Sequence, residues 1–194
     1  MRDWGRDCVC PPGTDNLCRH RFDGQYGDLP VGYDHKYVYS HFGYNLKATD
    51  MQAAIGLAQL EKLPHFVAQR RANFNRLYCA LAPVADKLIL PKACENSTPS
   101  WFGFAITCPD GATRDALIAH LEACGIQTRM LFAGNLVKQP CFDDMRRSHT
   151  GYRVVGDLHV TDEIMARTFW IGVYPGMTDE MLDYMATAVI EALQ

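Results

Sequence analysis

Apolar residues follow different patterns in different parts of the chain. Residues 1–35 show little periodicity and are rich in glycine and proline, which predicts an irregular segment. Thr49 and Gln52 then have the spacing of a capping box and predict the start of a helix. The following apolar residues fall mostly at helical spacing and predict one buried stripe, formed by Met51, Ala54, Ile55, Ala58 and Leu63. Pro64 predicts a break or kink, after which a second helix runs to about Leu81.

After Pro83 the pattern predicts a small domain of interleaved strands and helices. Short extended runs predict strands at 88–91, 101–107, 126–132 and around 169–174. Helices are predicted at 113–124, closed by Gly125, from Thr161, and from Thr178 to Leu193. This order favours an α/β class, a small α+β domain with helices on a sheet face. We therefore divide the chain into residues 1–48, a cysteine-containing loop with the remnant of a large domain, a connecting helix pair (49–82) and a C-terminal small domain (83–194).

Composition and charge exclude several classes of protein. A hydrophobic content of 48% supports a buried core, and a net charge of −3 argues against nucleic acid as a partner. No apolar run reaches the roughly 18 residues of a membrane helix, and no signal peptide is evident, so we expect a cytoplasmic protein without membrane contact. Five cysteines are scattered singly and are interpreted as small core residues: Cys79, Cys94, Cys108, Cys124 and Cys141.

Three further cysteines are grouped in the irregular first segment. Cys8, Cys10 and Cys18 lie within eleven turn-rich residues, where their thiolates could converge on one soft metal. The spacing leaves the metal open. His20 would complete a zinc site, whereas a cysteine from elsewhere would complete a 2Fe-2S cluster. Three unbound cysteines are the remaining alternative.

Two polar residues precede the predicted helix start. Asn45 and Lys47 place an amide and an ammonium next to the positive end of the helix dipole, where an anion such as phosphate would be stabilised. The alternative is that Asn45 only forms a turn and Lys47 is only solvated.

Longer motifs resemble a known enzyme family. The stretch HFGYNLKATDMQAAIGLAQLEKL at 41–63 is similar to a signature of the DegT/StrS-type sugar aminotransferases, which have the aspartate aminotransferase fold. GIQTRMLF at 125–132 and FWIGVYPGMTDEMLDYM at 169–185 resemble two further segments of that family. The resemblance implies that the chain is the C-terminal part of a fold type I, pyridoxal-phosphate-type enzyme.

The pattern C-x-C-x7-C resembles one branch of this family. Here it is formed by Cys8, Cys10 and Cys18, and the branch comprises the iron–sulfur CDP-4-keto-6-deoxyglucose 3-dehydratases of O-antigen and lipopolysaccharide synthesis. The resemblance implies a pyridoxamine or pyridoxal 5'-phosphate cofactor, a 2Fe-2S cluster, a CDP-sugar substrate and an NADH-dependent flavin and iron–sulfur reductase as partner. It also implies that the fourth cysteine and the catalytic histidine lie upstream. We therefore assign no catalytic residue to this chain and expect it to be inactive alone.

The resemblance also assigns roles to individual residues. Asn45 matches the family asparagine that reaches the cofactor phosphate of the neighbouring subunit, which implies a homodimer, and Lys47 occupies the adjacent basic position. Phe102 stands where many sugar aminotransferases carry a histidine near the substrate; burial in a strand is its alternative. Arg129 matches an arginine that would meet a phosphate or carboxylate of the substrate, with a structural salt bridge as its alternative.

Two other functions compete with the dehydratase. One is a part of an ordinary pyridoxal-phosphate sugar aminotransferase in which the cysteines are incidental. The other is a free-standing zinc-binding or interaction module built on Cys8, Cys10, Cys18 and His20. The cysteine group and Phe102 favour the dehydratase over the aminotransferase.

Overall fold

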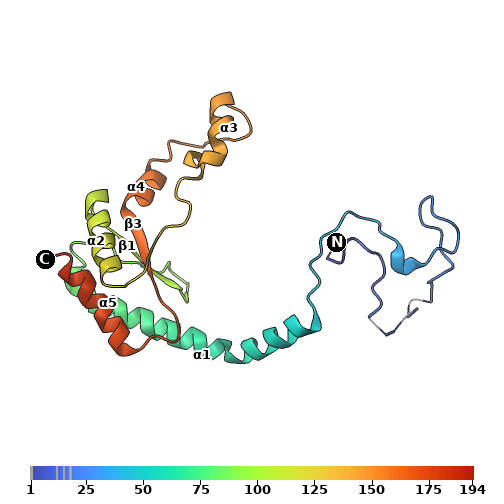
Figure 1. Ribbon diagram of the computed structural model, residues 1–194, viewed down its shortest axis with the longest axis horizontal. Helices are drawn as coiled ribbons and strands as arrows, with labels where there is room; N and C mark the ends of the chain where they lie inside the picture. The colour runs from blue at the N-terminus through green and yellow to red at the C-terminus, as the bar shows by residue number, and fades with distance from the viewer. Residues whose placement is uncertain (1, 12, 15, 18) are drawn as a thin grey trace. The chain divides into compact units, whose positions relative to one another are not determined.

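The chain forms two compact units (Figure 1). The computed structural model describes residues 2–11, 13–14, 16–17 and 19–194. The first unit is Met1–Glu61 and the second unit is Lys62–Gln194. Helix α1 (Asp50–Ala80) contributes residues to both.

The first unit is largely irregular, as its sequence predicts. Among the described residues before α1, one short 3-10 helix is present, η1 (His35–Tyr37). Isolated antiparallel bridges join Asp3 to Asn45 and Arg6 to Tyr39. The segment that contains the first cysteines is therefore tied to the segment that precedes α1.

The predicted capping box opens helix α1. The Thr49 amide donates to Gln52 Oε1 at 2.9 Å, and the Gln52 amide donates to Thr49 Oγ1 at 3.3 Å. The predicted helix pair is wrong, because Asp50–Ala80 is one continuous helix with Pro64 inside it. Proline removes one amide donor, and the hydrogen bonds on either side of it are sufficient to keep the long helix continuous.

The apolar residues of the first half of α1 are exposed. Met51 and Ile55 have exposed fractions of 78% and 64%, which corrects the expectation of a buried stripe. Burial begins further along the helix, at Asn73, Phe74 and Leu77. Helical spacing therefore identified the apolar face of the helix. It did not show whether another element packs against that face, since burial depends on elements distant in sequence.

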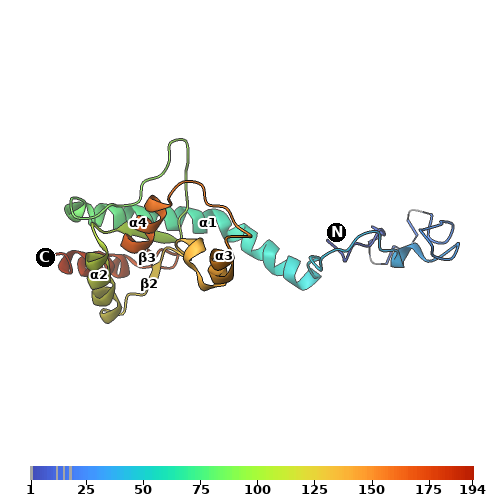
Figure 2. The ribbon, with the colours of Figure 1, turned by 90° about the horizontal axis from the view of Figure 1, so that it is seen from above.

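The second unit contains a three-stranded antiparallel sheet of order β1-β3-β2. Its strands are β1 (Gly103–Thr107), β2 (Thr128–Met130) and β3 (Thr168–Gly172). The predicted strand at 88–91 is reduced to a single bridge between Ile89 and Thr107. Figure 2 shows the green connection between α1 and β1 looping out before the chain enters the sheet.

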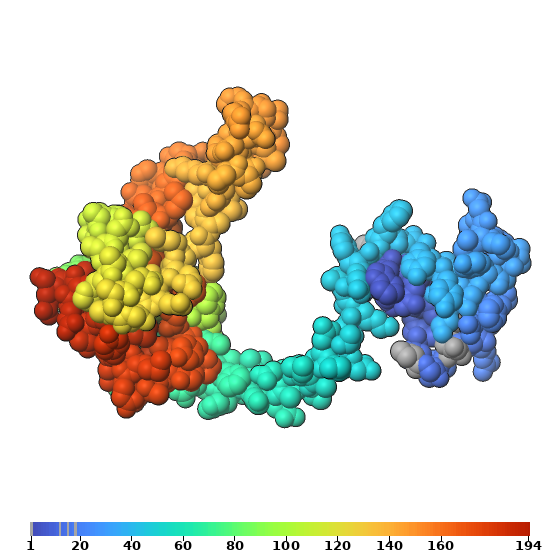
Figure 3. Space-filling view, viewed as in Figure 1, coloured from blue at the N-terminus to red at the C-terminus, as the bar shows by residue number. Residues whose placement is uncertain are grey.

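Four further α-helices belong to the second unit, namely α2 (Gly111–Ala123), α3 (Asp143–Ser148), α4 (His159–Arg167) and α5 (Asp179–Glu191). Asp110 and Thr178 cap the first and last of these, and Gly125, with φ +74°, follows α2 as predicted. Short 3-10 helices are η2 (Ala82–Val84), η3 (Leu136–Lys138) and η4 (Pro140–Phe142). Helix α3 was not predicted. Figure 3 shows that the connection carrying it, coloured yellow to orange, stands out from the rest of the second unit.

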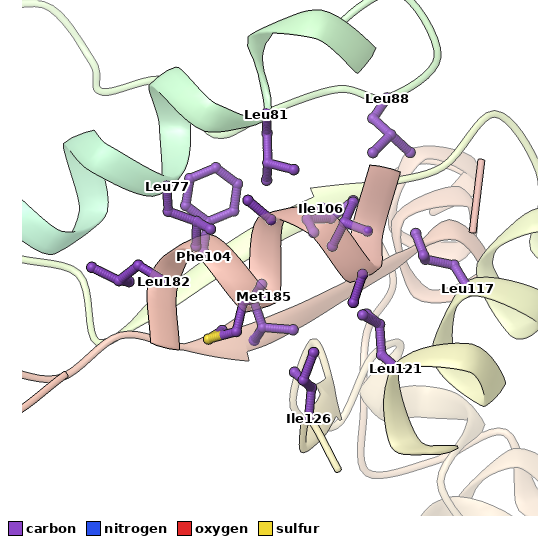
Figure 4. Close-up of a cluster of buried hydrophobic side chains, with 14 of the residues drawn as sticks. Leu77, Leu81, Leu88, Phe104, Ile106, Leu117, Leu121, Ile126, Leu182 and Met185 are labelled. Atoms are coloured by element: carbon purple, nitrogen blue, oxygen red, sulfur yellow. The ribbon is translucent and has the colours of Figure 1, made fainter. Parts of the chain in front are cut away.

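The core of the second unit lies on one face of the sheet (Figure 4). Phe104 and Ile106 point into it from β1, with Phe169 and Ile171 from β3. Leucines from three helices meet them, namely Leu77, Leu117, Leu121 and Leu182. Strand alternation sends the intervening residues to the opposite face.

The scattered cysteines do not all belong to this core. Cys108 is buried, and desolvation raises the pKa of its thiol to about 11, so this thiol is inert at neutral pH. Cys79, Cys94 and Cys141 are exposed and Cys124 is half-buried, which corrects the expectation for these four. Among the described helices, none is both long and apolar enough to cross a bilayer.

Candidate functional site

One pocket in the first unit collects several of the predicted site residues. Cys8, Cys10 and Lys47 line a cavity of about 420 Å³. The other lining residues are Arg2, Asp3, Arg6, Val9, Pro11 and Lys36. The third predicted metal ligand, Cys18, lies outside the described residues. We call this cavity the thiol pocket.

Basic side chains dominate the charge of the thiol pocket. Asp3 accepts from Arg6 at 2.5 Å and pairs with Lys47 at 3.4 Å. The Arg6 hydrogen bond holds the pKa of the Asp3 carboxyl below its usual value, and the same bond raises the pKa of Arg6. Among the described residues, four cationic side chains and one acid line the cavity, so its lining carries a net positive charge.

A complete metal site is not formed by the described residues. They contain no group of three or more His, Cys, Asp or Glu side chains placed to hold a metal ion. His20, the fourth ligand of the zinc alternative, contacts Asp23 at 2.9 Å between its Nδ1 and the carboxylate Oδ2. His20 is not among the residues that line the thiol pocket. Of the predicted cysteine ligands, Cys8 and Cys10 therefore share one pocket in the described part of the chain, and their role as metal ligands stays a prediction.

Backbone pairing brings Asn45 next to this pocket. The Trp4 amide donates to the Tyr44 carbonyl at 3.0 Å, and the Leu46 amide donates to the Arg2 carbonyl at 2.8 Å. These bonds set Asn45 opposite Asp3, whose carboxylate contacts Lys47. The side chains of Asn45 and Lys47 are exposed, four and two residues before the cap of α1 at Thr49, so the predicted phosphate ligands and two predicted thiolates lie in one neighbourhood.

Phe102 lies at a second location, on the sheet face opposite the core. Its ring meets Trp170 edge-on at 5.2 Å and Phe132 at 6.2 Å between centroids, and all three line a pocket of about 200 Å³. The exposed fraction of Phe102 is 56%, so its alternative interpretation as a buried strand residue is wrong. Gly103 follows it, where an added Cβ would lie 2.6 Å from the Trp170 ring.

Arg129 lies in β2, directly opposite Trp170 in the register. Its guanidinium donates to the Thr128 carbonyl at 2.8 Å and to Gln127 Oε1 at 3.3 Å. Arg129 is exposed and is not among the residues that line the aromatic pocket. The strand therefore presents the arginine on the surface, and its role toward substrate stays a prediction.

A carboxylate anchors the start of this strand. Glu122 Oε1 accepts from the Thr128 hydroxyl at 2.6 Å and from the Thr128 amide at 2.7 Å, and these bonds hold the Glu122 pKa below its ordinary 4.5.

The lowered pKa of Glu122 makes the stability of the second unit depend on pH. A carboxyl group with a lowered pKa contributes stability that is complete above its pKa in the unfolded chain and is lost as the pH falls through its pKa in the folded protein. Glu122→Gln should therefore flatten the loss of stability below about pH 4.5. Urea midpoints measured from pH 3 to 7 test this, with Asp86→Asn as the control; an unchanged slope in Glu122→Gln would contradict it.

Two contributors to these sites were absent from the sequence predictions. Asp3 organises Arg6 and Lys47, yet nothing in the sequence signals its pairing with a residue 44 positions away. Trp170 was detectable, because strand alternation places it on the face opposite Phe169 and Ile171.

Comparison with known proteins assigns a family. The model of the DegT/DnrJ/EryC1/StrS aminotransferase family matches residues 25–190. The chain is 57% identical over 189 residues to the lipopolysaccharide biosynthesis protein RfbH of Salmonella typhimurium, covering 96% of this chain and 42% of that protein. It is 51% identical over 193 residues to the dTDP-4-dehydro-2,6-dideoxy-D-glucose 3-dehydratase of Saccharopolyspora spinosa, covering 98% and 40%.

Solved structures agree on the fold. An aminotransferase from Psychrobacter cryohalolentis matches with a TM-score of 0.72 at 20% identity, over 99% of this chain and 47% of that one. The GDP-4-keto-6-deoxy-D-mannose-3-dehydratase of E. coli, solved with bound hydrated PLP, matches with a TM-score of 0.68 at 24% identity, over 90% and 46%. The predicted α/β fold, part of a fold type I chain, is confirmed. The chain spans about two fifths of the length of these curated relatives, and it belongs to the DegT/DnrJ/EryC1/StrS aminotransferase family.

Proposed function

We propose that the chain is part of a nucleotide-sugar 3-dehydratase of lipopolysaccharide sugar synthesis. The observation that carries this proposal is the 51% identity, over 98% of the chain, to a protein named as a sugar 3-dehydratase. The 57% identical relative is named as a lipopolysaccharide biosynthesis protein, which supports the same biological context. The reaction would remove the C3 hydroxyl of a 4-keto-6-deoxy sugar, and we place it in the cytoplasm.

The residues before α1 fit a pyridoxamine or pyridoxal 5'-phosphate group. Asn45 offers an exposed amide and Lys47 an exposed ammonium, and both are donors that match phosphate oxygens. When bound, the cofactor supplies an electron sink for elimination next to a ketone. Asn45 and Lys47 would hold its phosphate, and Asp3 would position the Lys47 ammonium through their 3.4 Å ion pair. In the proposed homodimer that phosphate belongs to the neighbouring subunit.

The thiol pocket fits part of a 2Fe-2S site. Cys8 and Cys10 present two sulfur ligands in one basic cavity, and such a cluster takes four cysteines. We propose Cys18 as the third ligand and a cysteine outside this chain as the fourth. Arg6 also lines the cavity and would place a positive charge near the thiolates that hold the cluster. An NADH-dependent flavin and iron–sulfur reductase is the proposed electron donor.

The nucleotide of the substrate is proposed to be CDP, following the resemblance of the cysteine pattern. Names of relatives point to two other nucleotides: dTDP in the 51% identical protein and GDP in one that is 37% identical over 98 residues. Phe102 and Arg129 are proposed to contact this substrate. The exposed Phe102 ring offers an apolar surface, and Arg129 offers a guanidinium to a phosphate or carboxylate.

A chimera tests the proposal, because the chain alone covers two fifths of its relatives. This chain replaces the matched region of Salmonella RfbH, and the purified chimera is assayed with the reductase on CDP-, dTDP- and GDP-linked 4-keto-6-deoxy sugars. We expect loss of the C3 hydroxyl from the CDP-sugar, detected by mass spectrometry. A product that has gained an amino group would instead identify an aminotransferase.

The isolated chain of 194 residues is the control for the chimera. We expect it to show no turnover, since its residues include no assigned catalytic base. Turnover by the isolated chain would contradict this assignment. A chimera that binds the cofactor and neither dehydrates nor transaminates any of the three sugars would overturn the proposed function.

A further inference from the structure

The aromatic pocket of the second unit has no charged or hydroxyl side chain in its described lining. Phe102, Phe132 and Trp170 form its walls, with ring centroids 5.2 to 6.2 Å apart. Gly103 and Ala105 line it from β1, where they alternate with the buried Phe104 and therefore face away from the core. At about 200 Å³ the pocket is smaller than the roughly 300–1,000 Å³ of sites for drug-sized ligands, so it takes one group of a ligand.

Two walls of the pocket are held by one backbone carbonyl. The Met130 carbonyl accepts from the Trp170 indole N–H at 3.1 Å and from the Phe132 amide at 2.7 Å. Phe132 has a φ of +49°, a left-handed conformation that bulky residues rarely adopt, and such strained residues cluster at ligand-binding sites. The rings are therefore positioned before a ligand arrives, and the indole N–H already has its acceptor.

A positive charge lies beside this apolar pocket. In the sheet register Trp170 is flanked by Ala105 of β1 on one side and by Arg129 of β2 on the other. Directly opposed residues of neighbouring strands share one face of the sheet. The exposed Arg129 guanidinium is thus on the same face as the pocket, an arrangement that complements a ligand with an apolar group and an anionic group.

We propose that the aromatic pocket receives the C6 methyl group of the sugar and selects 6-deoxy sugars over 6-hydroxylated ones. The identity of the ligand rests on the proposed function, whose nucleotide diphosphate supplies the anionic group for Arg129. A methyl group is stabilised when it leaves water for an apolar pocket. A hydroxyl at C6 would instead give up hydrogen bonds to water where the lining offers no charged or hydroxyl side chain in return.

Binding of unreactive nucleotide sugars to the RfbH chimera tests this proposal. The three sugars are 6-deoxyglucose, xylose and glucose, which carry a methyl group, a hydrogen and a hydroxymethyl group at C5. Each is linked to CDP, dTDP and GDP, and affinity is measured by titration calorimetry. We expect 6-deoxyglucose to bind about fourfold more tightly than xylose and about tenfold more tightly than glucose. None of these ligands has the C4 ketone, so the measurement does not depend on turnover.

Two substitutions assign the preference to the pocket. Ala105→Leu fills it and should weaken binding of the 6-deoxyglucose nucleotide by about tenfold while changing that of the xylose nucleotide by about twofold or less. Phe132→Ala removes an exposed wall, so it should fold normally and bring the two affinities to within about twofold of each other. Ala119→Leu, at an exposed position of α2, is the matched control and should keep the preference.

The possible outcomes separate this proposal from the proposed function. Circular dichroism verifies that each variant is folded. Equal affinities for the three sugars, no binding of any of them, or an equal loss for all three in a folded Ala105→Leu chimera would overturn the methyl pocket. Dehydration without the methyl preference would reject the pocket and retain the dehydratase, whereas the preference without dehydration would reject the dehydratase and retain the pocket.

Discussion

Replacing Phe104 with alanine is expected to lower the free energy of unfolding of the second unit by about 3–5 kcal/mol. The Phe104 side chain is fully buried, and its ring contacts Phe74 at 4.9 Å and Tyr78 at 6.4 Å between centroids. It is the point where β1 meets α1. Alanine removes the transfer free energy of the ring and leaves a cavity that the sheet and helix cannot close.

Urea denaturation followed by circular dichroism measures this loss. Phe102→Ala is the matched control, since it removes the same ring two residues away on the exposed face of the sheet. It should cost about 1 kcal/mol or less, because a half-exposed ring gains little from burial. Equal losses in the two variants would contradict the assignment of the core to one face.

Replacing Cys10 with serine in the RfbH chimera is expected to abolish the visible absorption of the iron–sulfur cluster. Cys10 shares the thiol pocket with Cys8, and a serine oxygen is a poor ligand for iron in such clusters. We expect the dehydration rate to fall by on the order of 100-fold or more. This exceeds the loss that is typical when a residue that only supports a metal ligand is changed. Iron content, absorption spectra and turnover give three independent measurements.

Cys141→Ser provides the control for cysteine removal. Cys141 is exposed in η4 of the second unit, so its loss should leave iron content and turnover unchanged. Full cluster loading in Cys10→Ser would remove Cys10 from the ligand set. Loss of turnover with an intact cluster would point to a role for Cys10 other than ligation.

Local signals in the sequence predicted the elements whose ends are fixed by short-range chemistry. Thr49 with Gln52, Thr178 and Gly125 all lie where capping rules place them. Each depends on bonds within a few residues, so the sequence alone contains the information. The fold type followed from these elements together with the family motifs.

Features that depend on distant residues were not predictable. The apolar residues around Ile55 have the spacing of a buried stripe, yet they are exposed because the core forms further along α1. Helix α1 also continues through Pro64. The presence of one proline in the sequence does not reveal whether the hydrogen bonds on either side of it keep the helix continuous.

The candidate site also combines features that local sequence patterns predict with features that depend on residues distant in sequence. Cys8 and Cys10 were identified from spacing and do lie together in one pocket. The contact of Lys47 with Asp3 depends on pairing between chain segments more than forty residues apart, and no local pattern encodes it. Phe102 was selected from a motif, but the aromatic cluster around it required the strand register.

The missing side chain at Gly103 links two distant positions of the sheet. A Cβ there would lie 2.6 Å from the Trp170 ring, so any side chain at 103 would require the indole to move. The absence of a side chain at 103 therefore leaves the space in which the Trp170 indole packs against Phe102 and Phe132.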